Sequence, residues 1–297
     1  KNMFRNSNDP FTGSSYSKNL ISKCFAADTI LFLQLMDEAA IASAASGTAS
    51  NGIAGVLVDG SSDPTVGYRV NESGIELTQV IEKGLMGAVF FYQAMEVYLS
   101  DDRMSEFNNS SIVEGEPYTN MEHYFDEAFG YFGAPVDFPS TLSLDDARFW
   151  AKYCNSRNEG LYEGINADMS RAFRTARAAI AAKDHETRNA SIQEIQEKWA
   201  IICAASAVDY LNQALSTSGN PEYRRHHAAS EAIGFMMALK YHFNGGNSMY
   251  PPVYNYTHIE EALLEVGLSS NFYELSDTEI QSAIDHIRMA FPTGQIK

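Results

Sequence analysis

The chain has 297 residues, and its 45% hydrophobic and 12% aromatic content excludes an intrinsically disordered protein. Its 38 acidic residues against 21 Lys and Arg give a net charge of −17, and the sequence has no basic stripe or basic helix. Such a surface repels phosphate backbones, so we expect no nucleic-acid partner. No apolar run reaches the roughly eighteen residues of a membrane-spanning helix.

The three cysteines do not form a metal or redox motif. Cys24, Cys154 and Cys203 are an odd set without a C-x-x-C pair, and Cys203 lies in an apolar helical stretch. We therefore expect buried, unpaired thiols. The sequence begins at Lys1 without an initiator Met and shows no signal peptide, so we expect a trimmed start, which is compatible with removal of an export signal.

The first half is predicted to be helical with one strand-like excursion. Apolar residues at three- and four-residue spacing predict helices over 17–46, 74–100 and 119–132. Residues 53–72 contain two strand-like runs around a turn, which predicts a small β-hairpin. Gly84 and Gly87 predict a helix face that a neighbouring helix approaches closely.

The second half repeats this style, with long helices joined by turns. Ser143 precedes two aspartates and is the expected N-cap of the first of these helices. The predicted helices cover 143–154, 161–183, 187–216, 221–243, 257–266 and 276–290. Helices with one minor β element predict an all-α protein. We expect two helical-bundle halves, 1–140 and 141–297, related by an internal duplication and packed as one compact unit.

Two helical segments share a pattern that carries a histidine and a glutamate, H-x-x-[DS]-E-A-x-G-[YF]. Such residues four positions apart lie on the same face of a helix. If the halves are related, the two copies face each other and offer two imidazoles and two carboxylates to one ligand. A glycine inside a helix costs roughly 1 kcal/mol relative to alanine, so each copy's glycine predicts close packing. The matched pairs are His123 and His227, Glu127 and Glu231, and Gly130 and Gly234.

The chemistry of this motif favours a metal site. Imidazole and carboxylate ligands together bind iron, zinc or manganese. The opposing interpretation is that each pair only hydrogen-bonds within the bundle and fixes packing. The absence of H-E-x-x-H and E-x-x-H argues against a zincin protease and a ferritin-type di-iron site. The candidate ligands are His123, Asp126, Glu127, His227 and Glu231, supported by Glu122, Tyr131, Gly130 and Gly234.

The remaining chemistry-bearing residues are assigned less specific roles. The tyrosine-rich loop 250–256 predicts either a carbohydrate or partner surface, or a lid packed on the bundle. Four histidines stand outside the motif, and we interpret them as isolated surface or packing residues: His185, His242, His258 and His286.

Three stretches, Lys83–Ala88, Glu122–Gly133 and His227–Phe235, resemble an uncharacterised family of exported Gram-negative lipoproteins. That family is similar to the imelysins, which are two-bundle all-α periplasmic or surface proteins linked to iron uptake and once classed as metallopeptidases. In the imelysin motif G-x-H-x-x-E, His123 and Asp126 occupy the His and Glu positions, and the glycine is replaced. The resemblance implies export, a lipid anchor, and a place in the periplasm or on the outer-membrane surface.

These observations lead us to expect an exported, non-enzymatic helical protein that binds a metal ion or a metal-linked ligand. The metal would be divalent, iron or zinc, and the role would lie in iron uptake. One alternative is a metal-dependent hydrolase, in which a carboxylate acts as general base beside a metal-bound water. Another is a surface module that binds glycans or proteins through the loop near Tyr254. Membrane contact is expected only through the lipid anchor.

Overall fold

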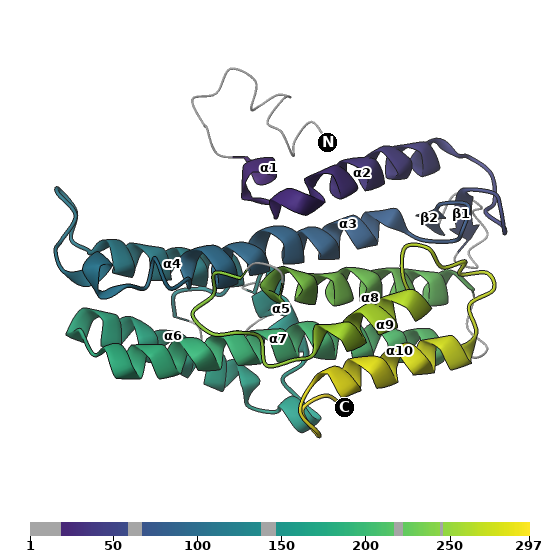
Figure 1. Cartoon of the computed structure of the whole chain (residues 1–297). Helices are drawn as coiled ribbons and strands as arrows, with labels where there is room; N and C mark the ends of the chain where they lie inside the picture. Colours follow the sequence, from purple (N-terminus) through teal and green to yellow (C-terminus); the bar gives the residue numbers. More distant parts are fainter. Residues whose placement is uncertain (1–18, 59–66, 138–146, 217–221, 244–245) are drawn as a thin grey trace, which may run out of the picture.

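The structure is a computed structural model that describes residues 19–58, 67–137, 147–216, 222–243 and 246–297. Its helices lie side by side around a shared core (Figure 1). Within the described chain, no helix combines the length and the apolarity that crossing a membrane requires.

The α-helices are α1 (Leu20–Lys23), α2 (Thr29–Ala44), α3 (Leu77–Leu85), α4 (Asn120–Phe132), α5 (Phe149–Ser156), α6 (Ile165–Ala182), α7 (His185–Ser216), α8 (Glu222–Phe243), α9 (Tyr256–Glu265) and α10 (Asp277–Ala290). Short 3₁₀ turns form η1 (Ala26–Asp28), η4 (Glu106–Asn109) and η5 (Gly160–Tyr162).

Within the described residues, the β-structure forms one sheet, a two-stranded antiparallel hairpin. Strand β1 (Gly55–Val58) pairs with β2 (Gly67–Val70), with Gly55 opposite Val70. The predicted all-α fold with one small hairpin within 53–72 is therefore confirmed. The turn of the hairpin and the predicted N-cap Ser143 lie outside the described residues.

Capping residues explain where several predicted helices begin and end. Thr119 Oγ1 accepts a hydrogen bond from the Glu122 backbone N at 3.2 Å, and Glu122 Oε2 accepts one from the Thr119 N at 2.8 Å. This reciprocal capping box starts α4. Gly133 ends it with φ 86°, a left-handed conformation that glycine adopts without strain. Asn255 and Ser276 cap α9 and α10 in the same side-chain-to-backbone way.

The helix predicted over 17–46 is interrupted after Lys23 by an extended residue with ψ 147°. The interruption frees backbone groups that bind a distant segment. Phe25 N donates to the Ala88 carbonyl at 2.8 Å, and the Lys23 carbonyl accepts from Gln93 Nε2 at 2.8 Å. Tertiary hydrogen bonds therefore compensate for the break, and apolar spacing does not reveal them.

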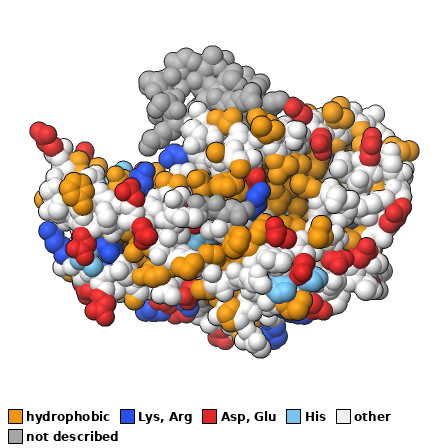
Figure 2. All heavy atoms as spheres, in the orientation of Figure 1, with side chains coloured by type: hydrophobic (Ala, Val, Ile, Leu, Met, Phe, Trp, Pro, Cys, Tyr) orange, Lys and Arg blue, Asp and Glu red, His pale blue; other side chains and the backbone are white. Residues whose placement is uncertain are grey.

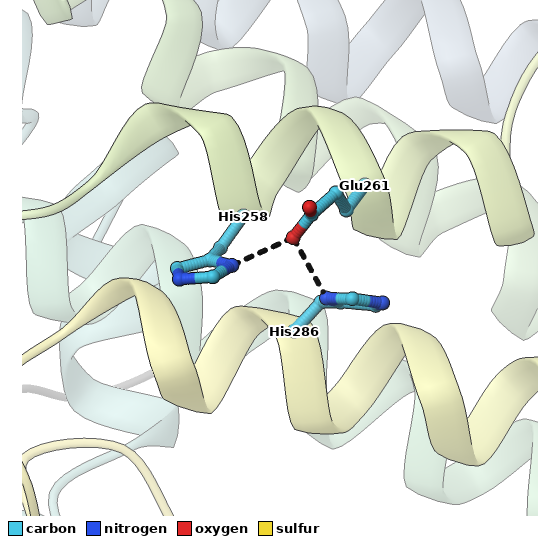
Figure 3. A group of neighbouring side chains, drawn as sticks. All are labelled: His258, Glu261 and His286. Atoms are coloured by element: carbon cyan, nitrogen blue, oxygen red, sulfur yellow. Dashed lines mark hydrogen bonds and ion pairs between the residues drawn. The ribbon is translucent and has the colours of Figure 1, made fainter.

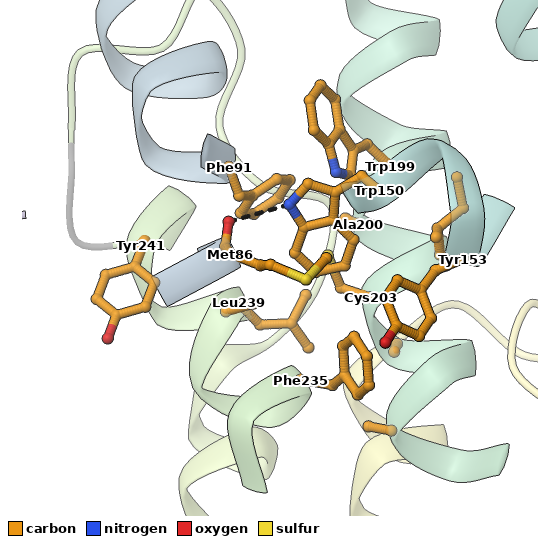
Figure 4. Close-up of a cluster of buried hydrophobic side chains, with 14 of the residues drawn as sticks. Met86, Phe91, Trp150, Tyr153, Trp199, Ala200, Cys203, Phe235, Leu239 and Tyr241 are labelled. Carbon is orange, nitrogen blue, oxygen red and sulfur yellow. Dashed lines mark hydrogen bonds between the residues drawn. The ribbon is translucent and has the colours of Figure 1, made fainter. Parts of the chain in front are cut away.

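Helix α3 continues into a stretch of π-helical geometry, η2 (Met86–Phe91) and η3 (Gln93–Tyr98). The helix predicted over 74–100 is thus confirmed in position, while its second half is wider than an α-helix. Carbonyls in this stretch accept hydrogen bonds from outside it. Trp150 Nε1 donates to the Met86 carbonyl at 3.0 Å (Figure 4).

One aromatic core draws on both predicted halves (Figure 4). Trp150 of α5 is fully buried. Its ring centroid lies 6.0 Å from Phe91, 6.3 Å from Trp199 and 5.9 Å from Phe235. Phe132 of α4 lies 4.9 Å from Trp199 in an edge-to-face contact. Residues before and after position 140 therefore pack around a common centre.

Helix α3 and its π-helical continuation run parallel to α8 and touch it through glycines. Gly234 lies against Gly84, and Ala238 lies against Gly87, so the contacts advance in the same direction along both segments. A Cβ atom on Gly234 would lie 2.8 Å from the Gly84 N, and one on Gly87 would lie 2.5 Å from the Ala238 Cα. The close approach predicted from these three glycines is confirmed.

Candidate functional site

The first copy of the repeated motif lines an open pocket beside α4. The pocket has a volume of ≈ 510 Å³ and lies between α4, η2 and the start of α5. His123 Nε2 lies 3.8 Å from Glu127 Oε1, and the imidazole stacks on Tyr118 with ring centroids 5.3 Å apart. Its lining residues are Phe90, His123, Asp126, Glu127, Gly130, Tyr131 and Phe149.

Arg177 of α6 pairs with two acidic side chains next to this pocket. Its Nε donates to Asp126 Oδ1 at 2.9 Å, and its Nη1 donates to Glu122 Oε1 at 2.7 Å. Burial alone would raise the pKa of Glu122, but hydrogen bonds from Thr119 and Arg177 outweigh burial and lower it. Each of these two carboxylates therefore already has a cationic partner.

Gly130 differs from its counterpart Gly234 in its surroundings. A Cβ atom on Gly130 would meet no atom of the described residues within 4 Å, because this face of α4 opens into the pocket. The prediction that a mid-helix glycine marks close packing is therefore wrong for the first copy and right for the second.

The second copy lies in a mostly buried ion network between α3 and α8. His227 Nδ1 lies 2.7 Å from Glu76 Oε2, and its Nε2 lies 3.5 Å from Glu231 Oε2. Glu231 Oε1 in turn lies 3.1 Å from Lys83 Nζ, whose side chain is only 4% exposed. Burial would lower the pKa of His227, but the hydrogen bond with Glu76 and the charges of Glu76 and Glu231 raise it. The ligand atoms of this copy thus already connect α3 to α8.

The two copies lie at different ends of the bundle. His227 lies beside Glu76, just before α3, whereas the His123 ring lies 6.2 Å from Tyr124, which lies 6.5 Å from Tyr98 at the end of η3. A helix from residue 76 to residue 98 is roughly 30 Å long. Figure 1 shows α4 at one end and the hairpin, which packs on α8, at the other. A shared local pattern determines a helix face but not the helix's place in the fold. The structure therefore does not assemble the expected joint site from His123, Asp126, Glu127, His227 and Glu231.

A third group of side chains converges where the sequence predicted isolated histidines (Figure 3). His258 and Glu261 lie on α9, and His286 lies on the facing helix α10. The Nδ1 atoms of His258 and His286 lie 2.6 and 3.0 Å from the same atom, Glu261 Oε2. Within the described chain, this is the one group of at least three His, Cys, Asp or Glu ligands whose atoms lie within 4.8 Å of one another.

This group is accessible and charged. The side chains of His258, Glu261 and His286 are 29%, 41% and 23% exposed. Figure 2 shows histidine side chains at the surface over α9 and α10, beside acidic ones. The hydrogen bond with His258 and the charges of both histidines lower the pKa of Glu261, which favours its ionised form. The His286 Nδ1 atom is buried and, within the described chain, lacks a hydrogen bond of ordinary geometry.

Part of this group was visible in the sequence. Glu261 follows His258 by three positions, which places both on one helix face. His286 has no such local signal, because its position depends on the antiparallel packing of α10 against α9. The interpretation of His258 and His286 as isolated residues is corrected by this contact.

Two other expectations are also revised by burial. His242 is buried, as expected of a packing residue, but it does not stand alone, because its Nδ1 lies 2.8 Å from Glu96 Oε1 in the core. Tyr254, proposed as part of a glycan surface, is 5% exposed, and its hydroxyl donates to the Leu239 carbonyl at 2.6 Å. This part of the tyrosine-rich loop packs on the bundle.

One sequence family spans nearly the whole chain. The family is described as a domain of unknown function, DUF4856, and it matches residues 3–290. The chain belongs to this family. A comparison with curated proteins and with solved structures finds no match. The family match confirms the expected membership of an uncharacterised family.

Proposed function

We propose that the chain binds a divalent transition-metal ion through His258, Glu261 and His286. The observation that carries this proposal is the convergence of two imidazole nitrogens on one carboxylate oxygen, at 2.6 and 3.0 Å. Two ligands at right angles, each about 2.1 Å from a metal ion, are about 3 Å apart, so these side chains need little movement to share one ion. The buried His286 Nδ1 lies 3.0 Å from Glu261 Oε2 but makes no hydrogen bond of ordinary geometry within the described chain, and a metal ion would satisfy this nitrogen.

The ligand set narrows the choice of metal. Two imidazoles and one carboxylate favour iron(II), zinc or manganese over magnesium and calcium, which prefer oxygen ligands. Three protein ligands leave coordination positions for water or a second ligand. His286 also lines an open pocket of ≈ 560 Å³ together with Asp277 and Asp285. This pocket supports the binding of a small ligand linked to the metal.

The proposed setting is iron uptake outside the inner membrane. The resemblance to exported lipoproteins and to imelysins supports export, a lipid anchor, and a place in the periplasm or on the outer-membrane surface. The three cysteines, Cys24, Cys154 and Cys203, are buried and unpaired, as predicted. Burial raises the pKa of each thiol, which slows oxidation and suits an oxidising compartment.

Isothermal titration of the metal-free protein with Zn²⁺, Mn²⁺ and, without oxygen, Fe²⁺ tests the metal proposal. We expect the wild type to bind at least one of these ions and His258→Ala/His286→Ala to lose that binding. His123→Ala/His227→Ala is the matched control, because it removes two histidines from the repeated motif and should keep wild-type affinity. The proposal fails if the wild type binds none of the ions. It also fails if the folded His258→Ala/His286→Ala variant binds as the wild type does.

The same variants separate binding from metal-dependent hydrolysis. A screen of peptide and ester substrates, with and without chelator, is run on the wild type and on His258→Ala/His286→Ala. We expect no turnover by either protein. Turnover that needs both the metal and these histidines would replace the binding proposal with the hydrolase alternative.

A further inference from the structure

The pocket beside α4 is walled by aromatic rings from three elements. Phe90 of η2 lies 4.3 Å from Phe149 of α5 and 5.8 Å from Tyr131 of α4, measured between ring centroids. Phe149 is 47% exposed, so a large apolar ring stays half open to solvent at the pocket. Aromatic walls around an open volume of ≈ 510 Å³ are typical of small-molecule sites.

Phe149 is held over this pocket by a strained backbone. Its φ of 46° lies in the left-handed region, which bulky residues avoid. The neighbouring residue Arg148 is braced against the end of α4, because its N donates to the Gly133 carbonyl at 3.0 Å. Gly133 permits this contact, since a Cβ atom there would lie 2.9 Å from the Arg148 carbonyl carbon. Strain that a fold retains beside a pocket is typical of ligand sites.

The pocket is acidic. Asp126 and Glu127 line it, and no Lys or Arg of the described chain is among its lining residues. Arg177 pairs with Asp126 from α6, whereas the Glu127 side chain is 31% exposed and lies 3.8 Å from His123. The net charge of −17 adds a long-range field that attracts cations.

We propose that this pocket binds a small organic cation, with an ammonium group beside Glu127 and an aryl or alkyl body against Phe90 and Phe149. An ammonium group within about 6 Å of an aromatic face is attracted by the ring quadrupole, and a nearby carboxylate adds to that attraction. This binding activity goes beyond the metal proposal, because the two sites share no residue.

Gly130 provides a way to fill the pocket without disturbing the core. It lies in the pocket lining, and a Cβ atom on it would meet nothing within 4 Å in the part of the chain that the structure describes. Its backbone lies within α4, where leucine is a better helix former than glycine. Gly130→Leu should therefore occupy the pocket while keeping or raising the stability of the fold.

Three probes that share a benzyl group and differ in charge test the proposal: phenylethylammonium, 2-phenylethanol and phenylacetate. Their affinities are measured by NMR titration at pH 7 in the presence of EDTA, so that no metal at His258 contributes. We expect phenylethylammonium to bind about tenfold more tightly than 2-phenylethanol, and phenylacetate to bind most weakly. Equal affinities for the three probes, or no binding of phenylethylammonium, would overturn the proposal.

Matched variants locate the binding. Gly130→Leu should abolish phenylethylammonium binding, and Glu127→Gln should lower it about tenfold, to the affinity of 2-phenylethanol. Ala40→Leu and Glu38→Gln, at exposed positions of α2, are the controls and should leave it unchanged.

Phe149→Ala removes an aromatic wall and is the second variant in case Gly130→Leu lowers the melting temperature. Unchanged phenylethylammonium binding in both Gly130→Leu and Phe149→Ala would overturn the proposal. Metal titration of His258→Ala/His286→Ala is a separate measurement, so failure of one proposal is distinguishable from failure of the other.

Discussion

His226 and His227 are adjacent in α8, but their imidazoles lie in opposite environments. His226 is 1% exposed, and its ring centroid lies 4.9 Å from that of Tyr273, whereas His227 Nδ1 lies 2.7 Å from a Glu76 carboxylate oxygen. Burial lowers the pKa of His226 to about 4. Burial also acts against protonation of His227, but the hydrogen bond and charge of Glu76, with the charge of Glu231, raise its pKa. The stabilising contribution of His226 should therefore be lost in acid, and that of His227 should be lost in alkali.

Lowering the pH should reduce the free energy of unfolding, because buried His226 must then become protonated. A folded-state pKa of about 4 means that the fold favours the neutral ring, so its contribution is full above the ordinary pKa of 6.5 and is lost as the pH falls toward 4. The difference between the folded-state pKa and the ordinary pKa of His226 corresponds to about 3 kcal/mol of unfolding free energy. Urea unfolding at pH 7.5 and pH 4.5 should show a smaller loss for His226→Leu than for the wild type. Equal losses in the two proteins would contradict this role.

Raising the pH should remove the contribution of His227 to the free energy of unfolding. Because its pKa is raised in the fold, its contribution is full below the ordinary histidine pKa and is lost as the pH rises through the folded-state value. Glu76→Gln should therefore cost about 1 to 3 kcal/mol at pH 6, the usual worth of a charge-assisted hydrogen bond, and less at pH 9. Glu72→Gln, at a neighbouring exposed position, is the control. A cost for Glu76→Gln that stays constant from pH 6 to pH 9 would sink the prediction.

The paired glycines of the repeated motif should respond oppositely to alanine. At Gly130 the added methyl group meets no atom of the described chain within 4 Å, so Gly130→Ala should raise the unfolding free energy by about 1 kcal/mol through helix propensity. At Gly234 it would lie 2.8 Å from the Gly84 backbone N, and overpacking should lower the free energy by about 1 to 3 kcal/mol. Denaturant titration of both variants measures the two signs. Stabilisation by Gly234→Ala would show that α3 and α8 can separate at no cost.

The thiols should react only after unfolding. Cys24, Cys154 and Cys203 are buried, and burial raises the pKa of the Cys24 thiol to about 11. The native protein should therefore be labelled by a thiol reagent far more slowly than the protein in concentrated guanidinium chloride. Fast labelling of a single cysteine in native buffer, followed by mass spectrometry to locate it, would disprove this protection.

The positions of the helices are readable from the sequence because local signals mark them. Thr119 and Gly133 bracket α4, and each acts on its own neighbours. The break after Lys23 and the π-helical stretch are not readable in this way, because both depend on hydrogen bonds between distant segments. The bond from Phe25 N to the Ala88 carbonyl is one of these.

In the candidate sites, too, the sequence predicts contacts within one helix but not contacts between distant helices. Helical spacing predicts that His123 and His227 each lie near the glutamate four positions later, and the distances of 3.8 and 3.5 Å confirm it. Whether two such pairs share a ligand depends on which helices pack together, and α3 rather than α4 packs along α8. The contact of His286 with Glu261 likewise required the position of α10 against α9.

The parallel packing of α3 and α8 has a consequence for the order of folding. His227 and Glu76 are 151 positions apart in the sequence, whereas the contact of Ser282 with Glu265 between α10 and α9 spans only 17. Closing a longer loop costs more chain entropy, so the local antiparallel pairs should form before α3 docks on α8. In pulse-labelled hydrogen exchange during refolding, amides of α9 and α10 should gain protection before those of α3. The docking of α3 on α8 is thus expected to be a late step, which joins segments from the first and second halves of the sequence into one folding unit.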